Sequence, residues 1–194
     1  MQPKYYGAAA DYRKSGGPGF RFDRKLVMIL GGGVVAILFI VIALGLINSA
    51  GSAPKNDLET LVAREQAFAA FINENQQSIN TSDLKKIAAE GALLITSDQN
   101  ELTAQLNTQY GVTEVPGDIV TAETDTASAA TLKTALASGQ FDHIFIGLLQ
   151  DKIAAIQALA NKVQSSASDE LLTALKQSNI TLQTLDKELT ALKL

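Results

Sequence analysis

The chain has 194 residues, with 46% hydrophobic and 19% charged side chains, a formal net charge of -4, one histidine and no cysteine. This composition excludes a wholly disordered protein, and the lack of cysteine excludes disulfides, thiolate metal sites and cysteine nucleophiles. Residues 1–25 carry six basic and two acidic side chains, whereas the remaining residues carry ten basic and eighteen acidic ones. Because this acidic body leaves no basic face to neutralise phosphates, no nucleic-acid partner is expected.

An uncharged stretch follows the basic head at residues 26–47, LVMILGGGVVAILFIVIALGLI. As a helix it would extend about 33 Å, enough to cross a hydrocarbon core of about 30 Å. We therefore predict a single transmembrane helix whose partner is the lipid bilayer. A cleavable signal peptide is the alternative, because small residues follow the stretch, but its apolar region and basic head would both be shorter.

Basic side chains flank only one end of this predicted span. Arg21, Arg24 and Lys25 adjoin its start, while no charge precedes Lys55 on the other side. The positive-inside rule then places the N-terminus in the cytoplasm and the C-terminal part of the chain outside it. The predicted protein is a single-pass protein of the cell membrane. We predict a disordered cytoplasmic tail before the span and, because turn formers follow it, a linker over residues 48–56.

Residues 57–194 have helical periodicity, and none of their segments alternates with a period of two. Asn56 and Glu59 have the spacing of a capping box, which predicts a first helix over residues 57–79. A second helix is expected over residues 81–110, beginning with polar capping residues and carrying its apolar stripe, which includes Leu94, to the end.

A longer connection with glycine and proline follows the second helix, and a short helix is predicted over residues 129–137. A third long helix is expected over residues 141–165, and the last begins after the capping residue Ser168. Four long amphipathic helices with two short turns and one longer connection predict an all-α fold, a four-helix bundle. The side chains predicted to face inward on the third long helix are Phe141, Phe145, Leu148, Ile156, Leu159 and Val163.

The run TLKTALASGQFDHIFIGLLQDK, residues 131–152, resembles a signature of ferritin-like extracytoplasmic bacterial domains of unknown function. In that family a short leucine-bearing helix leads to Ser-Gly, then Phe-Asp, then an aromatic residue three positions later. The resemblance covers roughly residues 57–192 and implies a four-helix bundle that follows a signal peptide or membrane anchor. The residues that match are Leu132, Leu136, Ser138, Gly139, Phe141, Asp142 and Phe145. The last five of these form a predicted structural corner.

The chain departs from the family where metal-binding histidines are usual. It has Asp98-Gln99 where the family has a histidine after the aspartate, and Asp151-Lys152-Ile153 where one or two histidines are usual. It contains no Glu-x-x-His motif of a di-iron carboxylate centre, and a protonated Lys152 would repel a cation. We therefore expect no metal, no other cofactor and no catalytic residue.

Four polar side chains near the predicted core have alternative interpretations. His143 lies off the inward stripe, so we expect a partly exposed side chain near a helix N-terminus rather than a chemical site. Asp142 is expected to be a first-turn or capping carboxylate. Asp98 and Lys152 both fall near apolar stripes; they are candidates for a buried ion pair, and the alternative is two charges at a solvated edge.

These features favour a membrane-anchored, extracytoplasmic bundle of the bacterial cell envelope with a structural or protein-interaction role, another envelope protein as its partner, and no enzymatic activity. A ligand-binding sensor is one alternative, although a sensor usually has a second span or a sizeable cytoplasmic output domain. A degenerate ferritin-like metal-binding domain is the other alternative.

Overall fold

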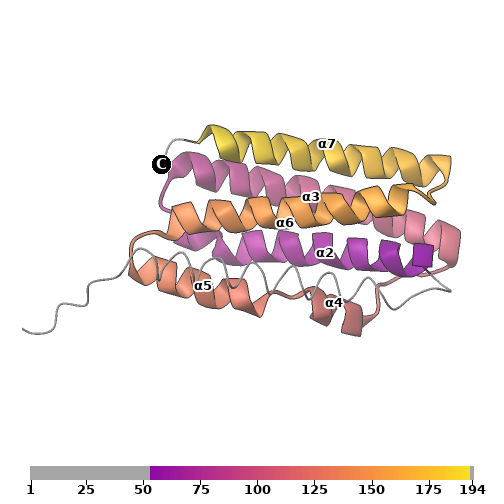
Figure 1. Ribbon diagram of the computed structural model, residues 1–194, viewed down its shortest axis with the longest axis horizontal. Helices are drawn as coiled ribbons and strands as arrows, with labels where there is room; N and C mark the ends of the chain where they lie inside the picture. Colours follow the sequence, from indigo (N-terminus) through magenta and orange to yellow (C-terminus); the bar gives the residue numbers. More distant parts are fainter. Residues whose placement is uncertain (1–52, 193–194) are drawn as a thin grey trace, which may run out of the picture. The chain divides into compact units, whose positions relative to one another are not determined.

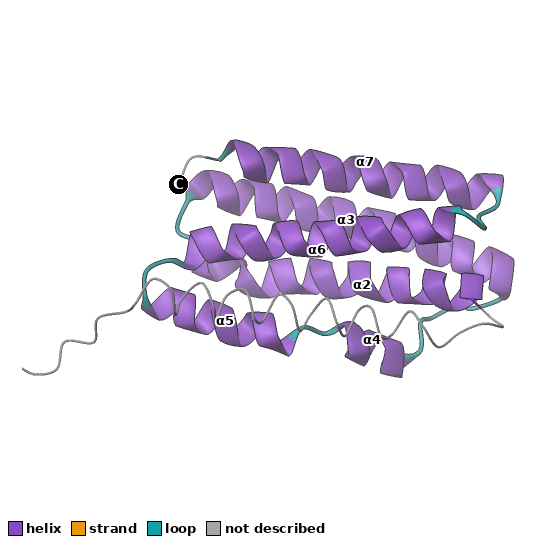
Figure 2. Ribbon diagram, viewed as in Figure 1, coloured by secondary structure: helices purple, strands orange, loops and turns teal. Residues whose placement is uncertain are grey.

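The computed structural model describes residues 53–192, which form helices joined by turns, with no strand in this part of the chain (Figure 2). The predicted all-α class is confirmed for these residues. The predicted tail and transmembrane helix, residues 1–25 and 26–47, lie outside them, as does most of the linker at 48–56. Within residues 53–192, no helix has both the length and the apolar character that crossing a membrane requires.

Four long helices pack side by side (Figure 1). They are α2 (Ala53–Asn75), α3 (Ser82–Tyr110), α6 (Phe141–Gln164) and α7 (Asp169–Ala191). Helix α2 packs against α3 and α6, and α7 packs against the same two helices, so α3 and α6 occupy opposite corners of the bundle. Short connections join α2 to α3, through the 3-10 helix η1 (Gln76–Ser78), and α6 to α7. The two helices of each of these pairs are therefore antiparallel.

A long crossover joins α3 to α6 and carries two short helices, α4 (Gly117–Glu123) and α5 (Thr126–Ala137). Helix α4 packs against α2 and α5 packs against α6, so the crossover returns along the outside of the bundle to the end where α3 began (Figure 1). Helices α3 and α6 therefore run in the same direction, and neighbouring long helices are antiparallel. Helix α4 was not predicted, because its glycine and polar residues resemble a loop.

The core is filled by apolar side chains from all four long helices. On α6 the predicted stripe is found, except that Leu148 is half-buried and Leu149 is fully buried beside it. On α3, Leu94 was predicted to face inward but is 51% exposed. Helices α3 and α7 approach closely at Gly91, where an added Cβ would lie 2.9 Å from Cδ1 of Leu185.

Two helix starts differ in how well local sequence predicted them. Helix α2 begins at Ala53, inside the predicted linker, so Asn56 lies within the helix and its proposed capping box with Glu59 is wrong. At the start of α7 the predicted cap is present, because the Ser168 hydroxyl accepts a hydrogen bond from the Leu171 N–H at 3.3 Å. A cap is a contact between near neighbours in the sequence, and local sequence could therefore predict it at α7.

Candidate functional site

A tight corner joins α5 to α6. Gly139 has a φ of 70°, a left-handed conformation that side chains other than glycine adopt only with strain. The Gln140 N–H donates to the Ala135 carbonyl at 2.9 Å, and the Gly139 N–H donates to the Leu136 carbonyl at 3.3 Å. These two bonds have the Schellman pattern, which ends one helix and redirects the chain within a few residues.

Asp142, in the first turn of α6, is bound to the start of α3. Its carboxylate accepts hydrogen bonds from the Asn80 N–H at 3.0 Å, the Thr81 N–H at 2.8 Å and the Thr81 hydroxyl at 2.6 Å. Burial opposes ionisation of Asp142, but these hydrogen bonds outweigh it and hold the pKa of this carboxyl below its ordinary value. Asp142 is therefore a first-turn carboxylate of α6, as predicted, and its hydrogen bonds go to the two residues before α3 and not to its own helix.

An aromatic cluster lies directly behind this corner. The rings of Phe141 and Phe145 are stacked, with centroids 5.5 Å apart, and the rings of Phe71 and Phe145 are 5.7 Å apart and tilted. Phe145 is fully buried, whereas His143, which lies between the two phenylalanines in the sequence, is exposed. The two phenylalanines on α6 therefore fix the corner to the core through α2, and the histidine faces away from it.

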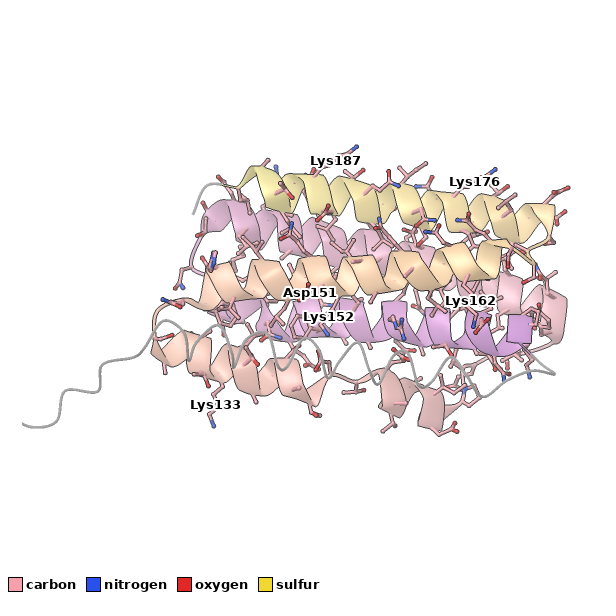
Figure 3. The ribbon with its side chains drawn as sticks, in the orientation of Figure 1. Lys133, Asp151, Lys152, Lys162, Lys176 and Lys187 are labelled. Carbon is pink, nitrogen blue, oxygen red and sulfur yellow. The ribbon has the colours of Figure 1, made fainter. Side chains whose placement is uncertain are left out.

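Lys152 pairs with the crossover and not with Asp98. Its Nζ lies 2.6 Å from Oδ2 of Asp125 and 4.6 Å from the ring centroid of Phe71. Asp125 is the N-cap of α5 and accepts a hydrogen bond from the Ser128 N–H at 2.9 Å. Burial opposes its ionisation, but Lys152 and Ser128 outweigh burial and lower its pKa. The candidate Asp98–Lys152 pair is wrong, because Lys152 pairs with Asp125 and points toward the α2 and α5 side (Figure 3).

A second ion pair holds α4. The Arg64 guanidinium on α2 donates to both carboxylate oxygens of Glu123, at 2.7 and 3.1 Å, and also to the Ala155 carbonyl on α6 at 3.3 Å. A bidentate pair of this kind fixes direction as well as distance. Arg64 thus joins three helices, and it was missed from the sequence because its partner lies on a helix that was not predicted.

Two glutamate side chains on α2, Glu59 and Glu65, are buried, and neither burial was predicted. Glu65 on α2 is 1% exposed; its Oε1 accepts a hydrogen bond from the Ser178 hydroxyl of α7 at 2.6 Å, while its buried Oε2 has no hydrogen-bond partner. Burial is the main cause that raises the pKa of Glu65 from 4.5 to about 8; the Ser178 hydrogen bond lowers it and the charge of Asp98 raises it. The sequence held a signal for this burial, because Glu65 stands four residues after Leu61 and three before Phe68 on the apolar stripe.

Asp98 on α3 borders the same interior region. It is half-buried; burial raises its pKa, and the nearby Thr181 hydroxyl of α7 acts in the opposite direction. Glu65, Asp98, Ser178 and Thr181 are named here the interior polar cluster. On α6 every buried residue that the structure describes is apolar. Over residues 53–192, no three His, Cys, Asp or Glu side chains are grouped so as to hold a metal ion.

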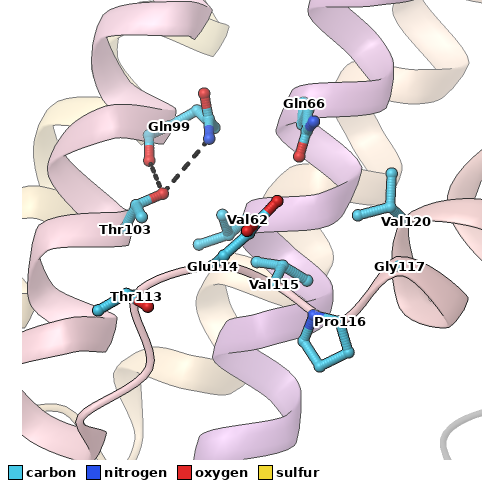
Figure 4. Close-up of a pocket in the computed structure, with 10 residues that line it drawn as sticks. All are labelled: Val62, Gln66, Gln99, Thr103, Thr113, Glu114, Val115, Pro116, Gly117 and Val120. Carbon is cyan, nitrogen blue, oxygen red and sulfur yellow. Dashed lines mark hydrogen bonds between the residues drawn. The ribbon is translucent and has the colours of Figure 1, made fainter.

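An open hollow of about 690 Å³ lies between α2, α3 and the loop before α4 (Figure 4). The amide side chains of Gln66 and Gln99 line it, together with the hydroxyl of Thr103 and the carboxylate of Glu114. The Gln99 amide donates to the Thr103 hydroxyl at 3.3 Å. The hollow therefore offers mainly uncharged hydrogen-bonding groups.

The fold and these contacts define an all-α protein in which polar contacts fix the crossover and the helix ends. Comparison of the chain with protein-family models, curated proteins and solved structures gives no match. The resemblance to ferritin-like domains therefore stays a prediction, and function has to be argued from the geometry.

Proposed function

We propose that this chain is a membrane-anchored, extracytoplasmic helical module of the bacterial cell envelope, with a structural or protein-interaction role and no catalytic activity of its own. The observation that carries the proposal is how the charged groups near the core are used. Asp142, Arg64 and the Lys152–Asp125 pair all bind internal partners that hold helix ends and the crossover in place. Side chains used in this way give a rigid scaffold on which an outer surface can bind another envelope protein.

The helix order supports a ferritin-like topology. Bundles of that type consist of two antiparallel pairs joined by one long crossover. Here α2 with α3 and α6 with α7 are such pairs, and the crossover carries α4 and α5 along one side (Figure 1). The Ser138–Asp142 corner, which first suggested the family, lies where this crossover enters α6.

The anchor and its orientation can be tested directly because the chain has no cysteine. Single cysteines would be introduced as Ser15→Cys in the head and Gln177→Cys at an exposed position of α7. On spheroplasts, a membrane-impermeant maleimide should label Gln177→Cys and should label Ser15→Cys only after the membrane is permeabilised. Labelling of both without permeabilisation, or a mature chain that starts near residues 50–54, would contradict the anchor.

The interaction role needs a separate test. Full-length protein purified from its native membrane should retain an envelope protein in a fixed ratio. The Gln177→Cys position can then carry a photoactivatable crosslinker to map the contact. A chain that is recovered alone after crosslinking on the outer faces of α3 and α7 would contradict this role.

The hollow in Figure 4 favours one second candidate, binding of a small polar ligand by an extracytoplasmic sensor-type bundle. Its size falls in the range typical of small-molecule pockets. Nuclear magnetic resonance of the labelled chain with small polyols, amides and amines would test it. Shifts confined to Gln66, Gln99 and Thr103 would favour ligand binding, and shifts spread over the surface would oppose it.

A further inference from the structure

We propose that Glu65 is a proton-binding site inside the bundle, and that release of its proton weakens the core packing around its contact with Ser178 of the diagonal helix α7. The protonated, neutral side chain fits this interior, whereas the carboxylate ion does not. This inference goes beyond the proposed structural role, because it makes the stability of the module depend on the pH around it.

The geometry at Glu65 argues for a neutral side chain. The Ser178 hydroxyl satisfies one oxygen at 2.6 Å, and the other oxygen is buried without a hydrogen-bond partner. A buried carboxylate requires a cation or several donors to replace the water it loses, and one hydroxyl is too little. A proton on Oε2 removes the charge and needs no additional space in the core.

No cation reaches Glu65 from the helices packed around it. Arg64, the next residue on α2, is directed to Glu123 of α4, and Lys152 of α6 is directed to Asp125. Helix α6 contributes only apolar side chains to the described buried core. The charges of Arg64 and Lys152 are therefore engaged on the crossover side of the bundle.

The charged group that does act on Glu65 is another carboxylate. Asp98 on α3 raises the cost of ionising Glu65, and α7 faces the pair with two hydroxyls, Ser178 and Thr181. Because a charge on Asp98 disfavours a second negative charge nearby, Glu65, the more buried of the two, retains its proton to higher pH. The interior polar cluster thus favours one proton on Glu65 and a charge on half-buried Asp98.

A metal ion fits the same residues less well. Hard cations such as Ca²⁺ take about six to eight oxygen ligands, and two carboxyls with two hydroxyls reach six only if both carboxyls bind through both oxygens. No three acidic or histidine side chains within residues 53–192 are grouped to hold one. The proton is therefore the ligand that these residues favour.

The sign of the pH effect follows from the direction of the shift. The folded-state pKa of Glu65, about 8, exceeds its ordinary value of 4.5, so its contribution to stability is full below pH 4.5 and is lost as the pH rises to about 8. Within that window, unfolding releases one proton, and the equilibrium constant for unfolding should increase roughly tenfold per pH unit. The increase should stop above the folded-state pKa.

The experiment is urea unfolding of the full-length chain, kept in a nonionic detergent, at intervals from about pH 6 to pH 9.5, below the range in which most lysines and tyrosines titrate. Wild type is compared with Glu65→Gln, which keeps the shape of the side chain and cannot ionise. Glu74→Gln is the matched control, since Glu74 lies on the same helix and is exposed. Carbon-13 resonances of the glutamate carboxyls, recorded over the same range, report the proton on Glu65 directly.

Wild type and Glu74→Gln should both lose about a hundredfold in the folding equilibrium between roughly pH 6 and pH 8, whereas Glu65→Gln should lose little of it. The Glu65 carboxyl resonance should titrate near pH 8. If Glu65→Gln does not fold, Asp98→Asn serves instead, because removing the Asp98 charge should move both the resonance and the unfolding profile to lower pH. A flat wild-type profile, or a Glu65 resonance that titrates near its ordinary value, would overturn the proposal. Stabilisation of wild type by Ca²⁺ or Mn²⁺ at alkaline pH, absent in Glu65→Gln, would replace the proton with a metal ion.

Discussion

Replacement of Phe145 by alanine should cost more stability than any other single change at the corner. Its side chain is fully buried and contacts the rings of Phe141 and Phe71 with centroid distances of 5.5 and 5.7 Å. Truncating a buried phenylalanine typically costs about 3–5 kcal/mol, since both transfer energy and a cavity are involved. Each aromatic pair adds about 0.5–1.5 kcal/mol, so we expect Phe145→Ala to lie at the upper end of that range.

The assay is urea unfolding of the full-length chain in nonionic detergent, followed by circular dichroism. For a slope of about 2 kcal/mol per molar urea, the midpoint should fall by roughly 2 M. His143→Ala is the matched control, because His143 is exposed two residues away on the same helix, and it should change stability by less than about 0.5 kcal/mol. If the two variants lost similar amounts of stability, His143 would have to take part in binding or packing that this structure does not show, and the reasoning would fail.

Three further predictions concern the polar contacts and the glycines. Asp142→Ala should lower the free energy of unfolding by about 1–3 kcal/mol through the lost hydrogen bonds. Because the pKa of Asp142 is lowered in the folded state, its carboxylate should stabilise the fold above the ordinary pKa of 3.8 and cease to do so on acidification. Wild type and variant should therefore converge in acid unfolding curves. In a double-mutant cycle, Lys152→Met and Asp125→Asn should show a coupling of about 1–2 kcal/mol in urea unfolding, and additive effects would refute the pair. Gly139→Ala should lower the free energy of unfolding by about 1–2 kcal/mol because of the positive φ of Gly139, and so lower the melting temperature. Gly147→Ala, in an open position of α6, should raise the free energy of unfolding by about 0.5–1 kcal/mol and so raise the melting temperature. Equal shifts of the two melting temperatures would argue against strain at the corner.

The helices could be predicted to a large extent because their signals are local. Apolar residues at three- and four-residue steps predicted the all-α class, and Ser168 marked the start of α7. Gly139 was predicted to belong to a corner between a short helix and a long one, and it lies there with a φ of 70°. Helix α4 was not predicted, since one of its contacts is the ion pair of Glu123 with Arg64 of α2, which is distant in the sequence.

The partners of the polar side chains could not be predicted from the sequence in the same way. Asp98 and Lys152 both fall near apolar stripes, but a stripe does not tell which helix lies opposite, and α3 and α6 prove to be diagonal. Asp142 was predicted to be a first-turn or capping carboxylate; it lies in the first turn of α6, but its hydrogen bonds go to Asn80 and Thr81 before α3.

The sequence by itself determined the helical class, the inward faces and the corner glycine, because each depends on residues a few positions apart. Only the tertiary structure decided that Lys152 pairs with Asp125, and that Glu65 lies in the core against Ser178 with one oxygen unpaired. An acidic residue on an apolar stripe can turn to solvent or be buried, and packing of helices distant in sequence selects between the two. Here Ser178 of α7 contacts Glu65 in the core. The free-energy cost of ionising the buried Glu65 depends on its loss of water, which no local sequence pattern encodes.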